Sequence, residues 1–170
     1  MNNKVKTLTR CALFTALGGA LLYISAFLPT LSLSIIALAG LTTSASVIHD
    51  RIGAGFSVYF ATVALSFLIV PDKGNVILYA AFFGLYPVLK SIAERPKTTL
   101  VCWLLKLLYF NGVFLCMWFF GKELLFGELP DIPFLMLIAA AVANAVFVIY
   151  DIGFDKLISY YIYAVARRIR

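Results

Sequence analysis

The chain has 170 residues, of which 63% are hydrophobic and 13% are charged, and its mean hydropathy is +0.99. A water-soluble protein of this length cannot bury so much apolar surface, because small domains expose a large share of their residues. The composition therefore excludes a soluble enzyme, a disordered chain and a nucleic-acid-binding domain, although the net charge is +6. We expect an all-α integral membrane protein with a bundle of six transmembrane helices.

The first three spans are predicted at 11–28, 31–48 and 52–70, each close to the roughly 20 residues that cross a bilayer. Pro29 and Thr30 leave almost no loop between the first two spans. These two helices should therefore form a tight antiparallel hairpin. The first stretch imitates a signal peptide, but its length exceeds a typical signal-peptide core, so we interpret it as a retained span.

The last three spans are predicted at 76–93, 98–120 and 132–150. The fourth reaches residue 93 if Lys90 extends its side chain to the lipid headgroups. The tail at 151–170 has too few consecutive uncharged residues to cross again. We expect it to form an interfacial helix or to continue the sixth helix at the cytoplasmic side. Residues 1–170 are thus predicted to form a single six-helix transmembrane domain.

The distribution of basic residues predicts the orientation of these spans. Only Lys73 and Lys122 fall outside when both termini are placed in the cytoplasm, and Lys106 lies within the fifth span. The other eleven basic residues fall inside, namely Lys4, Lys6, Arg10, Arg51, Lys90, Arg95, Lys97, Lys156, Arg167, Arg168 and Arg170. Because cytoplasmic loops concentrate Lys and Arg, we expect both ends to be cytoplasmic (N-in/C-in), in a bacterial cytoplasmic membrane.

Sequence motifs for common chemistries are absent. The chain has no P-loop, no HExxH motif and no GxSxG motif. Its single histidine, His49, cannot share a metal site with a second imidazole. The three cysteines, Cys11, Cys102 and Cys116, lie in apolar runs, as expected of small buried hydrophobic residues. We therefore expect no catalytic residues, no metal and no cofactor, and a membrane-embedded enzyme is the least favoured function.

Small residues recur every four positions in the first span, at Ala12, Ala16 and Ala20. This spacing places them on one helix face, and small residues let another helix approach closely in lipid. The face is predicted either to contact a partner protein or to pack within the chain itself.

Three polar residues lie within the later spans. Lys106 is eight residues past Thr98, or about 12 Å along the helix, a depth at which a charge is costly. No acidic residue lies in any predicted span, so we expect Lys106 to face a cavity between the fifth and sixth helices. Its partners would be backbone carbonyls, Asn144, tyrosine hydroxyls, water or a ligand. Asn111 and Asn144 can line the same cavity, or can form a simple interhelical hydrogen bond.

The architecture resembles that of the S components of energy-coupling-factor (ECF) vitamin and metal transporters, which also have six short spans in about this length. The basic residues that precede Ala12, Ala16 and Ala20 make this segment similar to the alanine motif of that family. Two further segments are similar to family segments: Gly53-Ala54-Gly55 and Gly84-Leu85-Tyr86-Pro87. The resemblance covers the whole chain in architecture and about a dozen residues in motif, whereas the first outer loop is unusually short here.

The resemblance implies a membrane subunit that binds a small-molecule substrate from outside, in a pocket near the outer side among helices four to six. It also implies that Ala12 and Ala16, with Ala20, dock onto a transmembrane coupling subunit that carries two ABC-type ATPases. Lys106, Asn111 and Asn144 are the candidate substrate-binding residues. The alternative is a small polytopic membrane scaffold or assembly protein without a substrate.

Overall fold

The structure, a computed structural model, describes residues 3–96, 98–120 and 134–164. These residues form helices and no strands, which confirms the all-α prediction. Within the described ranges, six helical stretches are long and apolar enough to cross a membrane: Lys4–Ser25, Pro29–His49, Ile52–Ile69, Lys73–Ala93, Thr99–Phe119 and Leu135–Ala164. The chain divides into two compact units, Met1–Arg95 and Pro96–Arg170, and each is described by itself.

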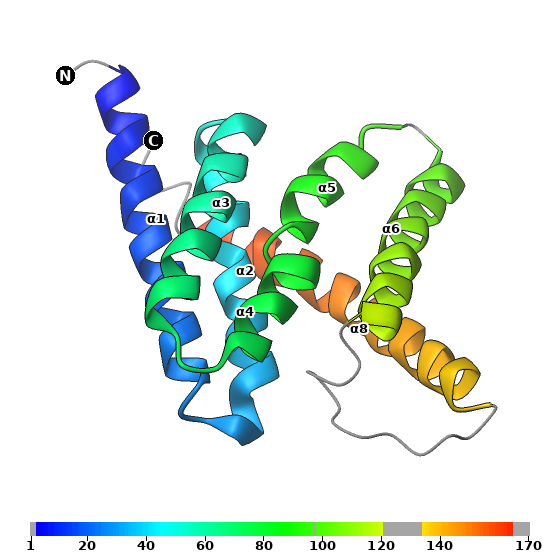
Figure 1. Cartoon of the computed structure of the whole chain (residues 1–170). Helices are drawn as coiled ribbons and strands as arrows, with labels where there is room; N and C mark the ends of the chain where they lie inside the picture. The colour runs from blue at the N-terminus through cyan, green and yellow to red at the C-terminus, as the bar shows by residue number, and fades with distance from the viewer. Residues whose placement is uncertain (1–2, 97, 121–133, 165–170) are drawn as a thin grey trace. The chain divides into compact units, whose positions relative to one another are not determined.

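The first unit begins with three antiparallel helices that pack against one another, α1 (Asn3–Ser25), α2 (Ser32–His49) and α3 (Ile52–Ile69) (Figure 1). Residues 26–31 join α1 to α2 and end in a 3₁₀ turn, η1 (Pro29–Leu31). Proline suits this first turn because its fixed φ is already helical. The expected antiparallel hairpin is therefore present, with a connection of six residues rather than the predicted two.

The fourth span is divided into three helical pieces, α4 (Lys73–Leu78), the π-helical turn η2 (Tyr79–Phe83) and α5 (Tyr86–Ala93). In η2, the backbone N–H of Gly84 donates to the carbonyl of Tyr79, five residues back, at 2.7 Å. Pro87 lacks the N–H that would bond to the Phe83 carbonyl, so a regular α-helix cannot run through this point. The span ends at Ala93, as predicted.

Glycine allows η2 to approach the helices around it. A Cβ on Gly40 of α2 would lie 2.6 Å from the carbonyl oxygen of Phe83, and a Cβ on Gly84 would lie 2.6 Å from the Tyr79 ring. Both distances are shorter than any real contact, so these positions require glycine. A buried cluster then fills the space among these helices, formed by Leu22, Ile36, Ala39, Tyr59, Val70, Val76 and Tyr79.

The side chain of Lys90 runs toward the C-terminal end of α5. It is buried, with its ammonium 3.1 Å from Glu94 Oε1 and 5.7 Å from the centre of the Tyr86 ring. The ammonium thus lies one turn nearer the polar end of α5, and its extension to the lipid headgroups stays a prediction.

The second unit is an antiparallel pair of helices, α6 (Thr99–Phe120) and α8 (Leu135–Ala164). The 30 residues of α8 make it about 45 Å long, more than the roughly 30 Å of a bilayer core. Residues 151–164 continue the helix of the sixth span without a break, and their position in the lipid headgroup zone stays a prediction. The predicted outer loop, which contains Lys122, and the basic end at 165–170 lie outside the described residues.

Candidate functional site

A buried ion pair joins α6 to α8. The ammonium of Lys106 lies 2.9 Å from Oδ2 of Asp151, and the two side chains are only 6% and 1% exposed. The ammonium also lies 5.3 Å from the ring centre of Trp103, one turn earlier in α6, in a cation–π arrangement. The charge of Lys106 is therefore compensated within the second unit.

Asp151 corrects the sequence-based expectation that no acidic residue lies within any span. Residues 151–164 were predicted as a tail because their charges ended the apolar run. In the structure α8 continues without a break through Asp151. The helix can carry this carboxylate because Lys106 compensates its charge in an apolar environment. The predicted inward orientation of Lys106 is confirmed, whereas the predicted set of partners lacked Asp151.

Asn111 and Asn144 form a reciprocal amide pair, in which each side chain donates to the other at 2.9 Å. Each amide also donates to a carbonyl in its own helix, Asn111 to Leu107 at 2.9 Å and Asn144 to Ala140 at 2.8 Å. The structure therefore contains the simple interhelical hydrogen bond that was the alternative to a cavity. Asn144 bonds to Asn111 rather than to Lys106.

The two polar pairs belong to one seam between the helices. The rings of Phe110 and Phe147 stack between them, with centroids 4.3 Å apart and planes at 17°. As the residue number rises along α6, the number of the partner on α8 falls, from 151 to 147 to 144, as antiparallel helices require. The seam holds α6 and α8 in one register, and a ligand that used its polar groups would have to displace these bonds.

The three alanines of α1 lie on its exposed face. The small residues that pack against α2 and α3 are instead Gly18 and Gly19. A Cβ on Gly18 would lie 2.9 Å from Thr42 Oγ1, and a Cβ on Gly19 would lie 3.1 Å from Leu65 Cδ2. Within the described residues of the first unit, the alanine face therefore does not pack against α2 or α3.

A group of buried hydroxyls in the first unit was not identified from the sequence. The hydroxyls of Thr43 and Tyr79 lie 3.1 Å apart, and Tyr59 donates to the carbonyl of Ala80 in η2 at 2.9 Å. Thr62 and Ser66 are fully buried on one face of α3, and their hydroxyl oxygens have no hydrogen-bond partner among the described residues. The spacing of four between Thr62 and Ser66 was the available signal.

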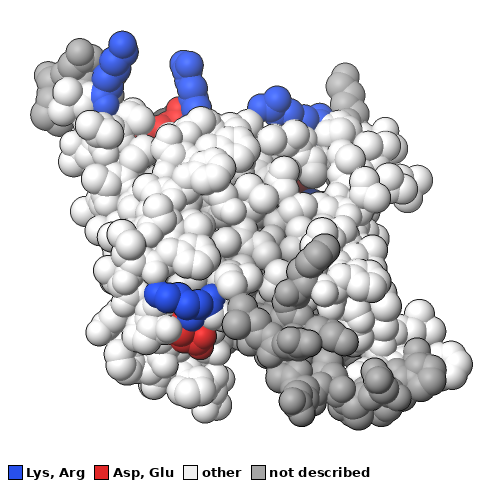
Figure 2. Space-filling model, in the orientation of Figure 1, with Lys and Arg blue, Asp and Glu red and all other residues white. Residues whose placement is uncertain are grey.

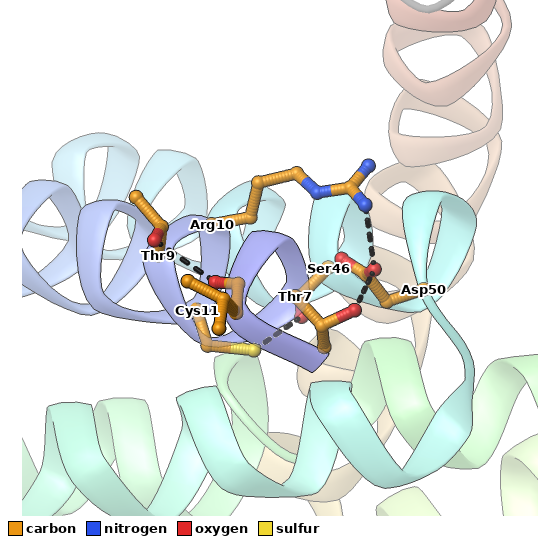
Figure 3. Close-up of polar contacts among 7 residues, drawn as sticks. Thr7, Thr9, Arg10, Cys11, Ser46 and Asp50 are labelled. Atoms are coloured by element: carbon orange, nitrogen blue, oxygen red, sulfur yellow. Dashed lines mark hydrogen bonds and ion pairs between the residues drawn. The ribbon is translucent and has the colours of Figure 1, made fainter. Parts of the chain in front are cut away.

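A second polar junction connects the start of α1 to the end of α2 (Figure 3). Oδ1 of Asp50 accepts from Thr7 at 2.7 Å and from Arg10 at 2.9 Å. One turn further on, Sγ of Cys11 lies 3.9 Å from Oγ of Ser46. The sequence placed Arg10 and Asp50 on the same side of the membrane but did not predict their contact.

Among the described residues no group of His, Cys, Asp and Glu side chains could hold a metal ion. Comparisons with protein-family models, with curated proteins and with solved structures gave no match. By length and composition, the six apolar helices mark the chain as a multi-pass membrane protein.

Proposed function

We propose that the chain is a membrane-embedded, substrate-binding (S-type) subunit of an ECF-like ABC importer. It captures a small solute from outside and docks on a transmembrane coupling subunit. The observation that carries the proposal is the exposed strip of small residues on α1, formed by Ala12, Ala16 and Ala20. We call it the alanine strip.

The alanine strip is distinct from the face that α1 uses within its own unit. Gly18 and the fully buried Leu22 pack inward, whereas a ridge of large exposed residues runs beside the strip, formed by Leu13, Leu17 and Ile24. Small side chains let the backbones of two helices approach closely, and helices associate in lipid in this way. The alanine strip therefore suits a helix of a partner protein.

The proposed orientation is N-in/C-in in a bacterial cytoplasmic membrane, from the distribution of Lys and Arg. Ala12 would then lie near the cytoplasmic end of α1. In the ECF arrangement the coupling subunit connects to its two ABC-type ATPases at that side. An alanine strip that starts there is well placed to contact the coupling subunit.

Docking can be tested by replacing Ala12 and Ala16 with leucine, whose bulk prevents close approach of a partner helix. The tagged protein is purified from native membranes and its partners are identified by mass spectrometry. The expected partners are a transmembrane protein and ATPases with P-loops, and the Ala12→Leu/Ala16→Leu variant should lose them. A matched control is Ala61→Leu/Ala64→Leu, which adds the same bulk to exposed alanines of α3 and should retain them. Recovery of equal amounts of the partner proteins with both variants would refute docking through the alanine strip.

A membrane scaffold or assembly protein without substrate is the second candidate function. It is favoured by the hydrogen bonding of the candidate ligand residues, because Lys106, Asn111 and Asn144 all have partners within the second unit. A scaffold would use the same alanine strip but would carry no bound solute. The presence of a solute therefore separates the two functions.

A further inference from the structure

The charged residues of the first unit are distributed unequally between its two ends. Figure 1 shows the start of α1, the α2–α3 junction and the end of α5 at one end of the unit, and Figure 2 shows Lys and Arg side chains along that edge, above a largely uncharged surface. The basic residues of this end are Lys4, Lys6, Arg10, Arg51, Lys90 and Arg95, against the acidic residues Asp50 and Glu94. The opposite end has only Asp72 and Lys73. We call the first of these the basic end.

The two acidic residues do little to reduce the exposed positive charge of the basic end. Asp50 is only 6% exposed and is held by Arg10 and Thr7, while Glu94 is paired with the buried Lys90. The remaining basic residues, Lys4, Lys6, Arg51 and Arg95, are exposed. Because Glu94 is also exposed, the surface of this end carries four exposed basic residues against one exposed acidic residue.

Arg10 has hydrogen-bonding capacity beyond its bond to Asp50. One terminal nitrogen donates to Oδ1 of Asp50 at 2.9 Å, and the side chain is 38% exposed. Figure 3 shows the other terminal nitrogen directed away from Asp50. A guanidinium has five N–H donors in a planar fork, which matches the oxygens of a phosphate group. Asp50 thus positions Arg10 while leaving donors for a second anionic group.

The surface next to these positive charges is apolar. Val5, Leu8 and Leu13 are exposed large hydrophobic residues of α1, and Leu8 is 71% exposed although it lies between Lys6 and Arg10. A free phosphate would make no use of such a surface, whereas the acyl chains of a lipid would cover it. Anionic headgroups attract basic residues that lie at the edge of an apolar span.

We propose that the basic end binds the phosphates of anionic phospholipid headgroups, with Arg10 as a direct phosphate ligand positioned by Asp50. Lys4, Lys6 and Arg51 add long-range attraction to the same headgroups. This inference does not depend on the proposed transport function, because a scaffold would bind the same lipids.

The test compares lipids retained by the full-length protein in native mass spectrometry. The protein is equilibrated with equal amounts of phosphatidylglycerol and phosphatidylcholine, and the wild type should be enriched in phosphatidylglycerol. In the Lys4→Gln/Lys6→Gln/Arg51→Gln variant, the enrichment in phosphatidylglycerol should fall about fivefold for each basic side chain removed. Lys73→Gln, at the opposite end, is the matched control and should retain the enrichment.

Two further experiments identify the chemical group that the basic end binds. Arg10→Lys keeps the charge and can keep the ion pair with Asp50, but it loses the planar fork, so it should lower the enrichment while the melting temperature stays unchanged. Glycerol phosphate at millimolar concentration should not compete. Equal lipid ratios in the wild type and the triple variant would overturn the proposal, and so would full competition by glycerol phosphate, which would indicate a site for free phosphate.

Discussion

Lys106 and Asp151 lie opposite each other in an apolar helix pair, so each depends on the other for charge compensation. Removing one partner of a buried pair costs about 3–5 kcal/mol, whereas replacing both with apolar residues can be neutral or stabilising. We therefore expect Lys106→Met to lower the free energy of unfolding by about 3 kcal/mol or more, and Lys106→Met/Asp151→Leu to recover most of it. Thermal or denaturant unfolding in detergent micelles measures both.

Lys156 provides the control for this pair, because it lies on an exposed turn of the same helix α8. Lys156→Met should change the free energy of unfolding by no more than about 0.5 kcal/mol. If Lys106→Met alone were as stable as the wild type, the ion pair would contribute nothing to holding α6 and α8 together.

The hydroxyl of Thr62 is buried without a partner among the described residues. A buried polar group without a hydrogen bond is destabilising, and valine has nearly the same shape without the hydroxyl. Thr62→Val should therefore raise the free energy of unfolding by about 1 kcal/mol. Thr42→Val is the control, because the Thr42 hydroxyl donates to the Ala39 carbonyl at 2.8 Å and its removal should bring no gain. A loss of stability in Thr62→Val would mean that this hydroxyl is bonded, for instance to a buried water.

At the scale of the elements, the contact between α2 and the π-helical turn η2 depends on Gly40. A methyl group there would lie 2.6 Å from the Phe83 carbonyl oxygen. This oxygen belongs to the backbone of η2, so it cannot move aside as a flexible side chain could. We expect Gly40→Ala to destabilise the first unit by about 1–3 kcal/mol, as overpacking does. Gly53→Ala is the matched control, since nothing lies within 4 Å of its added methyl and alanine favours the helix. Equal melting temperatures for the two variants would contradict the close contact.

The helical spans were predictable because their apolar runs match the thickness of a bilayer. The predicted and observed ends of α2, α3 and α6 differ by at most two residues. The interruption at η2 was not predicted, because it depends on Pro87 together with the space that Gly40 leaves in another helix. Hydropathy along one helix contains no information about such a neighbour.

The candidate site was predictable in part. The energetic cost of a buried ammonium correctly placed Lys106 against another helix. Its partner was missed because Asp151 ends an apolar run, and a hydropathy criterion therefore ended the sixth span at Tyr150. The length of α8 depends on the pairing of the two charges across helices, which is a tertiary effect.

At the scale of the whole molecule, the N-in/C-in orientation remains a prediction from the distribution of basic residues. It can be measured with a membrane-impermeant maleimide after Cys11, Cys102 and Cys116 are replaced by alanine. Cysteines introduced at Lys73 and Lys122 should be labelled from outside, and one at Arg51 only after the membrane is permeabilised. Labelling of Arg51→Cys in intact cells would show that the charge distribution had been misinterpreted.

The most direct measurement of the central claim, that this membrane protein captures a small solute, is native mass spectrometry of the protein released from its own membranes. We predict a mass increment that corresponds to one bound small molecule per chain, identifiable after denaturation. The contrary result is the mass of the protein alone, with no bound small molecule, in a preparation in which the transmembrane partner is still bound through the alanine strip. That result would contradict substrate capture and favour the scaffold.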